Sequence, residues 1–170
     1  VFGCLATYFI GLCLFGRRIG WMSSLILASS WLYFSLTRVL LLDLAVSVLL
    51  TASIGCFACA LQYSRSLKRR MLFYGFSFFL ALSVLTKGLM GLVIAGSIII
   101  LWLTIAKLWK KLFPIYFLSS FLIFLAVALP WHWLVARENP EFLRFYFIQE
   151  HFLRYLTPMH NRYQPAWFFL

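Results

Sequence analysis

Charged side chains are scarce in this sequence. Asp, Glu, Lys and Arg make up 11% of its 170 residues, against about 25% of an average soluble domain. Hydrophobic residues make up 64%. This composition excludes a soluble globular domain. It also excludes a disordered chain, which requires low hydrophobicity and high charge.

Acidic residues are the scarcest of the charged types. The chain has 4 Asp and Glu against 15 Lys and Arg, which gives a formal net charge of +11. In a soluble protein this excess would point to nucleic acid. In a hydrophobic chain it is explained by the cytoplasmic loops of a membrane protein, where Lys and Arg concentrate, so no nucleic-acid partner is predicted.

Complete cysteine motifs and a leader segment are also lacking. The four cysteines lie inside apolar runs, and Cys56 and Cys59 have the spacing of a metal or redox motif without a second pair or a nearby His. All four are predicted to be small helix-packing residues. The chain starts at Val1 without a basic leader, and 167–170 has the composition of the start of another span. We therefore expect a fragment of a longer protein.

Long apolar runs predict an all-α, polytopic integral membrane protein. At about 20 residues per crossing, we expect about six transmembrane helices within 1–130. The six runs lie at about 1–15, 20–36, 39–63, 72–86, 88–106 and 112–130. One alternative is a single re-entrant hairpin over 72–106, which would leave the sidedness unchanged. No internal repeat and no broken helix is evident.

Basic residues occupy every second gap between these runs. Three gaps contain nine of the 15 Lys and Arg residues, whereas the two gaps between them contain only Arg38 and Lys87. Cytoplasmic loops carry the excess of Lys and Arg in membrane proteins. We therefore predict that the three basic gaps are cytoplasmic, and that Arg38, Lys87 and all residues after Pro130 lie on the outer side.

The segment 131–170 differs in character from the apolar runs. Its first residues, 131–133, are Trp-His-Trp, a cluster typical of a membrane interface. Asn-Pro-Glu at 139–141 is typical of a helix start. Because polar residues recur on one side over 140–156, we expect an amphipathic helix on the outer membrane surface, followed by a loop that leads into a further span.

Asp43 is the candidate catalytic residue. It lies about four residues into the apolar run 39–63, and an acid inside a membrane span is by default a candidate for a functional site. A structural ion pair with Arg38 is the alternative, although helix neighbours are three or four residues apart and these two are five apart. Arg38 is itself a candidate substrate-binding residue.

Further candidate substrate-binding residues lie on the same predicted side. Lys87, beside Gly88, suits a phosphate group, and snorkelling to the interface is the alternative. The others are Glu150, His151, Arg154 and Arg162, for which a solvated surface is the alternative. One acid and several cations at the outer interface suit an anionic, lipid-linked substrate.

Several short motifs, in their order and on their predicted side, resemble one family. They are Thr37-Arg38 with Leu42-Asp43, Leu85-Thr86-Lys87-Gly88, Pro130-Trp131-His132 with Asn139-Pro140, Gln149-Glu150-His151-Phe152, and His160-Asn161-Arg162. Spread over about residues 30–170, they resemble the bacterial aminoarabinose transferase and dolichyl-phosphate-mannose protein mannosyltransferase-like family of C-type glycosyltransferases.

The resemblance implies an enzyme that moves a sugar from a polyprenyl-phosphate carrier to lipid A, another glycan or a protein. The implied place is the periplasmic face of the bacterial inner membrane. The family's chief catalytic carboxylate lies in an earlier outer loop, so Asp43 matches its second acid and Lys87 its carrier-phosphate lysine. Glu150 and His151 match a motif near the site. The resemblance requires no cofactor and leaves a divalent metal open, since two adjacent side chains fall short of the about four ligands of zinc.

Two other functions remain open on the residues alone. One is a transporter or lipid flippase in which Asp43 and Lys87 form an ion or proton relay. Transporters often contain internal repeats and broken helices, and the apparent lack of both argues against this function. The other is a non-catalytic membrane scaffold, which would leave the gathering of polar residues on one side unexplained.

Overall fold

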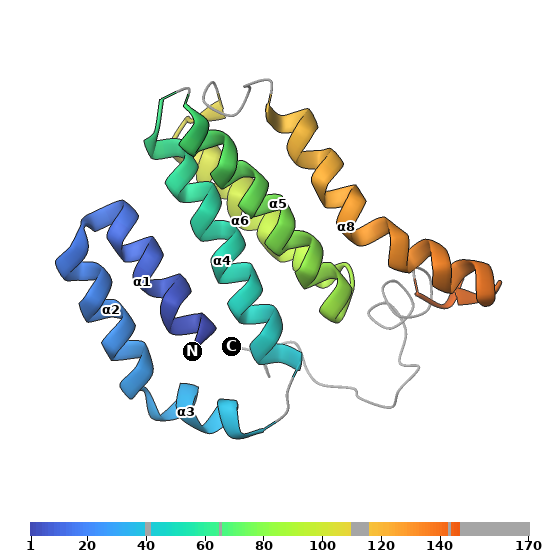
Figure 1. Ribbon diagram of the computed structural model, residues 1–170, viewed down its shortest axis with the longest axis horizontal. Coiled ribbons are helices and arrows are strands. Elements are labelled where there is room, and N and C mark those ends of the chain that lie inside the picture. Colours follow the sequence, from blue (N-terminus) through green and yellow to red (C-terminus); the bar gives the residue numbers. More distant parts are fainter. Residues whose placement is uncertain (40–41, 65, 110–115, 143, 147–170) are drawn as a thin grey trace. The chain divides into compact units, whose positions relative to one another are not determined.

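The computed structural model describes residues 1–39, 42–64, 66–109, 116–142 and 144–146, and their regular structure is entirely helical. The predicted all-α fold is therefore confirmed. The helices are α1 (Phe2–Phe15), α2 (Arg17–Ser29), α3 (Trp31–Arg38), α4 (Leu42–Gln62), α5 (Leu67–Lys87), α6 (Met90–Ile105) and α8 (Tyr116–Glu138) (Figure 1). The chain forms two compact units, Val1–Leu129 and Pro130–Leu170.

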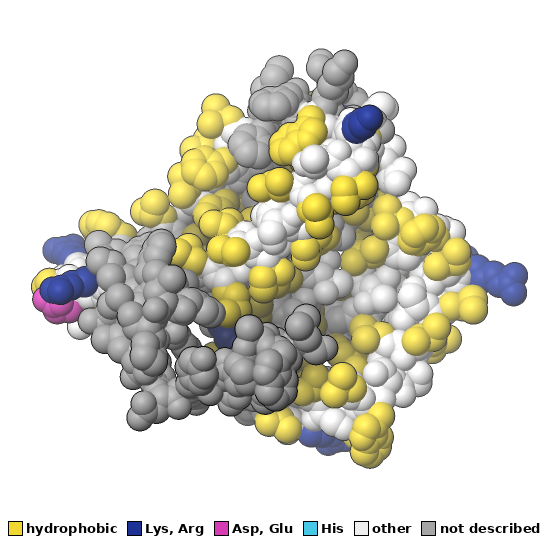
Figure 2. Space-filling model, turned by 180° about the vertical axis from the view of Figure 1, so that it is seen from behind, with side chains coloured by type: hydrophobic (Ala, Val, Ile, Leu, Met, Phe, Trp, Pro, Cys, Tyr) yellow, Lys and Arg dark blue, Asp and Glu magenta, His cyan; other side chains and the backbone are white. Residues whose placement is uncertain are grey.

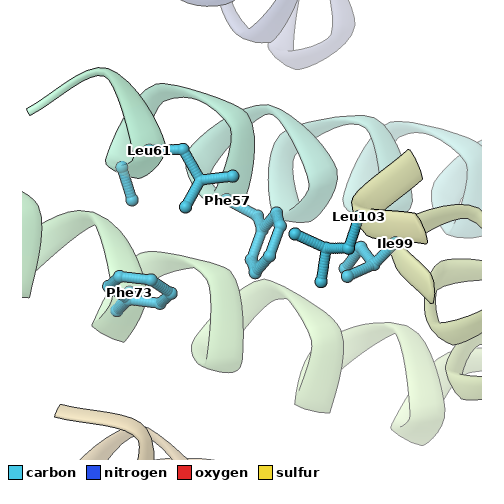
Figure 3. Packing of buried hydrophobic residues seen from close by; sticks show 6 residues of the cluster. Phe57, Leu61, Phe73, Ile99 and Leu103 are labelled. Atoms are coloured by element: carbon cyan, nitrogen blue, oxygen red, sulfur yellow. The ribbon is translucent and has the colours of Figure 1, made fainter. Parts of the chain in front are cut away.

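The first unit is centred on the pairing of α4 with α5. α6 packs against both of these helices, and α1 packs against α2 and α4. In the core between α4, α5 and α6, the buried ring of Phe57 meets Phe73 edge-on at a centroid distance of 5.9 Å (Figure 3). A second cluster of Val46, Leu50, Leu80 and Ala95 continues the core toward the start of α4 and the end of α5. This packing sets the two helix ends beside each other.

Three helices of the described residues are long and apolar enough to cross a membrane: Leu42–Gln62, Leu67–Lys87 and Leu118–Glu138. The pair α2 and α3 makes a fourth if it is counted as one span. α1 and α6 are shorter apolar helices of 14 and 16 residues. The chain is a multi-pass membrane protein, and the number of six crossings stays a prediction.

The run 20–36 is not one straight helix. α2 and α3 are bent by 59° at Ser30, whose φ of −66° and ψ of 118° are extended. Ser29 Oγ donates to the carbonyl of Ile26 at 3.1 Å, and such serine bonds compete with those that continue a helix. The pair is either one broken span or a re-entrant loop, so one crossing over 20–36 stays a prediction. The expectation of no broken helix, on which part of the argument against a transporter depended, is wrong.

Two helices extend past their predicted bounds. α8 continues through Pro130 to Glu138, although proline lacks the N–H that would bond the carbonyl four residues earlier. Membrane helices tolerate proline because neighbouring groups can satisfy the freed carbonyl. α5 begins at Leu67 rather than at 72, because Ser66 Oγ caps it by accepting a bond from the Arg69 N–H at 3.3 Å.

Two glycines bring α1 and α2 into close contact. A Cβ on Gly20 would lie 2.9 Å from both the Leu12 nitrogen and the Tyr8 oxygen. A Cβ on Gly11 would lie 2.7 Å from the Cα of Gly20. Membrane helices associate through such close backbone approach, since burial of apolar surface adds little driving force in lipid. The hairpin of α1 and α2 therefore depends on the small size of both residues.

Large hydrophobic side chains are exposed along the outer surfaces of the helices. Figure 2 shows them spread over the displayed face, with most of the visible Lys and Arg side chains near its margins. Trp31 is 79% exposed and Ile105 is 74% exposed. A soluble monomer rarely exposes contiguous apolar surface on this scale. The surface is that of a protein surrounded by lipid or by further apolar helices.

Candidate functional site

Asp43 and Lys87 form an ion pair at adjoining helix ends, in which Lys87 Nζ donates to Asp43 Oδ1. Asp43 lies in the first turn of α4, and Lys87 is the last residue of α5. Gly88 ends α5 directly after Lys87, because its φ of 78° leaves the helical region while its N–H still bonds to Val84 O at 2.8 Å. Each charge also complements the dipole of its own helix.

Both side chains of this pair remain accessible. The exposed fraction is 63% for Asp43 and 39% for Lys87. An exposed pair contributes only about 0–1 kcal/mol to stability in water, so its main consequence is that it fixes the position of the Lys87 ammonium group. The ammonium group has three donors and the bond to Asp43 uses one, so Lys87 can bind a second anion while the carboxylate holds it in place.

The structure corrects the expected surroundings of Asp43. Because α4 begins at Leu42, Asp43 lies in the first turn of its helix rather than four residues inside a span. Its ion pair goes to Lys87, whereas the sequence alternative was Arg38. Arg38, the last residue of α3, instead places its guanidinium carbon 4.9 Å from the centroid of the Phe34 ring.

A large apolar cavity adjoins the ion pair. It has a volume of about 1040 Å³ and is lined by α1, α3, α4 and α5. Leu42 and Leu44, on either side of Asp43, belong to its lining, as does Leu82 on the α5 segment that leads to Lys87. Most of the other lining side chains are hydrocarbon, among them Phe2, Phe9, Ile10, Leu49, Phe78 and Phe79. The cavity can accept a hydrocarbon chain whose polar end lies at the ion pair.

A second, smaller cavity of about 330 Å³ includes Asp43 in its lining. Six of its twelve lining residues carry a side-chain oxygen: Thr7, Ser30, Tyr33, Asp43, Ser47 and Thr51. They come from α1, the break at Ser30, α3 and α4. The two cavities are adjacent, because both are lined by Gly3, Tyr33, Leu44 and Val48.

Most of the predicted outer segment lies outside the described residues. This applies to Glu150, His151, Arg154 and Arg162, and to the predicted amphipathic helix beyond residue 146. In the described part, the Phe142 N–H bonds to Asn139 O and the Phe145 N–H to Glu141 O, each at 2.9 Å. Arg144 and Phe145 are both exposed, so this turn by itself does not separate a polar face from an apolar one.

Aromatic rings gather around His132 in the second unit. Its ring centroid lies 5.0 Å from that of Trp131 and 5.3 Å from that of Tyr146, which in turn stacks on Phe142 at 5.3 Å. Burial raises the pKa of the Tyr146 hydroxyl. These contacts join the end of α8 to the turn after Asn139. Within the part of the chain that the structure describes, no group of three or more His, Cys, Asp or Glu side chains could hold a metal.

The sequence predicted Asp43 and Lys87 as site residues but did not predict the smaller cavity. One signal was present, since Asp43, Ser47 and Thr51 recur every four residues and therefore share a face of α4. Thr7 and Tyr33 gave no such signal, because their place in the cavity depends on the packing of α1 and α3 beside α4.

Comparison with known proteins places this geometry in context. A family model described as dolichyl-phosphate-mannose-protein mannosyltransferase matches residues 1–146. Undecaprenyl phosphate-alpha-4-amino-4-deoxy-L-arabinose arabinosyl transferase 1 of Proteus mirabilis is 29% identical over 142 residues, which cover 84% of this chain and 26% of that protein. The corresponding transferase 2 of Sodalis glossinidius is 27% identical over 167 residues, which cover 98% of this chain and 30% of that protein.

A solved structure has the same fold. ArnT from Cupriavidus metallidurans bound to undecaprenyl phosphate superimposes with a TM-score of 0.80 at 22% identity, over 89% of this chain and 28% of that one. The apo state of the same protein gives a TM-score of 0.79. The chain thus spans less than a third of the length of the relatives it matches, between 26% and 30% in the two sequence comparisons above.

Proposed function

Because this chain belongs to the family of dolichyl-phosphate-mannose-protein mannosyltransferases, we propose that it forms part of a membrane glycosyltransferase and binds a donor in which a sugar is linked to a polyprenyl phosphate. The family resemblance of the sequence motifs is thereby confirmed. The proposed acceptor is a lipid such as lipid A, another glycan or a protein. The proposed place of reaction is the periplasmic face of a bacterial inner membrane.

The observation that carries this proposal is a cation paired with Asp43, whose chain neighbours Leu42 and Leu44 line an apolar cavity. A polyprenyl phosphate has a long hydrocarbon chain and one anionic group, and it needs both features close together. Lys87 supplies the charge, and the cavity of about 1040 Å³ supplies the apolar surface. A transporter relay would also use Asp43 and Lys87, but it would have no need of the adjoining apolar cavity.

The relatives support the same class of donor. The two arabinosyl transferases are named for a sugar carried on undecaprenyl phosphate, and the superimposed ArnT structure contains undecaprenyl phosphate. The family description names a sugar carried on dolichyl phosphate. Both carriers are polyprenyl phosphates, so the carrier class is the common element on which the proposal depends.

The proposed chemistry assigns different roles to the two charged residues. In transfer, an acceptor oxygen bonds to the anomeric carbon, and the bond from that carbon to the phosphate oxygen breaks. A hydroxyl acceptor gives its proton to a base, a role that the family resemblance assigns to a carboxylate of an earlier outer loop. The phosphate changes from a diester to a monoester and gains negative charge. Lys87 stabilises this charge more strongly in the transition state than in the bound donor, which lowers the barrier. Asp43 contacts Lys87 and positions it, so it acts through the cation rather than as the base.

An inhibition experiment with the full-length protein tests the proposal. Transfer from a polyprenyl-phosphate donor is measured in the presence of undecaprenyl phosphate, geranyl phosphate or undecaprenol. We expect inhibition to be strongest for undecaprenyl phosphate, because it alone supplies both the long chain and the phosphate. Equal inhibition by undecaprenol would remove the role of the cation, and equal inhibition by geranyl phosphate would remove that of the apolar cavity.

The predicted sidedness gives a separate test. In a full-length variant without native cysteines, Ser66→Cys and Leu108→Cys should be protected from a membrane-impermeant thiol reagent in intact cells, because they lie in basic gaps. Asn161→Cys should be labelled. The measurement compares labelling before and after permeabilisation of the inner membrane. Labelling of Ser66→Cys in intact cells would contradict the outer position of Asp43 and Lys87.

A further inference from the structure

We infer that the smaller cavity beside Asp43 binds the sugar ring of the donor. This inference rests on the proposed function, because it takes the carrier phosphate to be bound at Lys87. Asp43 contacts Lys87 and also lines the smaller cavity, while its neighbours Leu42 and Leu44 line the apolar one. A phosphate at Lys87 would therefore have its hydrocarbon chain beside one cavity and its sugar beside the other.

The smaller cavity has several hydrogen-bond acceptors in a lining whose surface is otherwise largely apolar. Thr7 Oγ1 donates to Gly3 O at 2.9 Å, Ser47 Oγ to Asp43 O at 2.7 Å and Thr51 Oγ1 to Ser47 O at 2.8 Å. Each hydroxyl thus donates its only hydrogen to a backbone carbonyl, and its lone pairs remain able to accept a hydrogen bond. The carboxylate of Asp43 adds further acceptors. Such a lining favours a ligand with several O–H or N–H donors, as a sugar has.

The break between α2 and α3 adds donors at the same place. The first bond of the α3 ladder runs from the Phe34 N–H to Ser30 O at 3.0 Å. The N–H groups of residues 31–33 precede it and have no acceptor within the helix. Leu32 and Tyr33 line the cavity, so the N–H groups of these two residues lie at its wall. Both hydrogen-bonding functions of a sugar hydroxyl therefore find partners here.

The size of the cavity indicates that its ligand is the sugar of the donor rather than the acceptor. Its volume of about 330 Å³ is at the lower end of the about 300–1,000 Å³ that ligand pockets span. This volume suits one monosaccharide and is too small for lipid A, an oligosaccharide or a protein segment. An acceptor of any of these kinds must approach the anomeric carbon from outside the cavity.

An ordinary structural explanation of the hydroxyls makes a different prediction. Ser and Thr in membrane helices often bond their own backbone without any further role. Thr104 in α6 has this same arrangement, since its Oγ1 donates to Ile100 O at 2.8 Å, and it lines neither cavity. It is therefore a matched control for Thr51, because replacing either threonine with valine removes an equivalent hydroxyl at nearly constant volume.

The experiment uses the full-length enzyme and two readouts. The first is KM for undecaprenyl phosphate carrying mannose or 4-amino-4-deoxy-L-arabinose, whichever the wild type transfers. The second is the inhibition constant of undecaprenyl phosphate, which has no sugar. Thr51→Val should raise the KM about threefold to tenfold, the usual effect of one lost hydrogen bond, and leave the inhibition constant unchanged. Ser47→Leu, which fills the cavity, should raise the KM further, and Thr104→Val should change neither value.

Three results would overturn the inference. A wild-type KM in Thr51→Val, whose shape is conserved, would show that its hydroxyl does not meet the sugar. A parallel rise of the inhibition constant in Thr51→Val would show that the cavity serves the carrier instead. If the wild type transfers neither sugar and undecaprenyl phosphate does not bind, the proposed function is wrong, and so is this inference, which depends on it.

Discussion

Replacing Lys87 with alanine in the full-length protein is expected to lower the turnover of sugar transfer by about 100- to 1,000-fold, or roughly 3–4 kcal/mol of transition-state stabilisation. The reason is that Lys87 faces a phosphate that gains charge as the sugar leaves, so the lost interaction is larger in the transition state than in the bound donor. The measurement is sugar transfer from a purified polyprenyl-phosphate donor, with the amount of each variant in the membrane determined in parallel.

Variants of the same region separate this role from a structural one. Lys87→Arg keeps the charge and the contact with Asp43 but changes the geometry, so only partial activity is expected. Lys68→Ala removes a lysine from the other end of α5 and should leave transfer unchanged. Asp43→Asn should impair transfer while the protein remains folded, because it removes the charge that orients Lys87 and conserves the shape. Near-normal transfer by both Lys87→Ala and Lys87→Gln would instead identify Lys87 as a snorkelling lysine.

Gly20→Leu is expected to separate α1 from α2 and to cost about 3 kcal/mol or more of stability, at the upper end of overpacking effects. The new side chain would meet the backbone of α1, where a Cβ already lies 2.9 Å from Leu12 N and from Tyr8 O. Backbone cannot move aside as a flexible side chain can, so the two helices must part. The measurement is resistance of the purified full-length protein to unfolding by SDS in mixed micelles.

Gly96→Leu is the matched control for this change. Gly96 lies inside α6, and a Cβ there would meet nothing within 4 Å, so the same substitution does not force the new side chain against backbone. It should leave unfolding close to wild type. Equal loss of stability in both variants would mean that leucine in place of a helical glycine is harmful in itself, and that close approach of α1 to α2 is not the cause.

The helical, membrane-spanning character of this chain could be predicted from sequence because it depends on local properties. A run such as 39–63 contains one charged residue, and its length matches that of a membrane helix whatever surrounds it. The same holds for the candidates in the site. Asp43 and Lys87 were conspicuous because each interrupts an apolar stretch, and the short motifs around them were enough to indicate the family that the comparison then confirmed.

Helix boundaries were predicted less well, because capping and backbone competition act over a few residues. Ser66 starts α5 before its apolar run begins, and Ser30 interrupts an apolar run without a proline or glycine. Pro130 predicted an end that α8 does not have. In each case the local composition was compatible with more than one backbone path, and hydrogen bonds of single groups decided between them.

Only the tertiary structure decided which residues meet. Asp43 pairs with Lys87, 44 positions away, rather than with the nearby Arg38, because the packing of α4 on α5 sets the start of one helix beside the end of the other. The two cavities arise in the same way, since their walls come from helices that are far apart in the chain. Sequence by itself determined that this protein lies in the membrane and which side chains are unusual there. The position of the ion pair beside two cavities, of which the smaller has hydroxyl and carboxylate groups in its lining, follows from long-range packing, which no local pattern specifies.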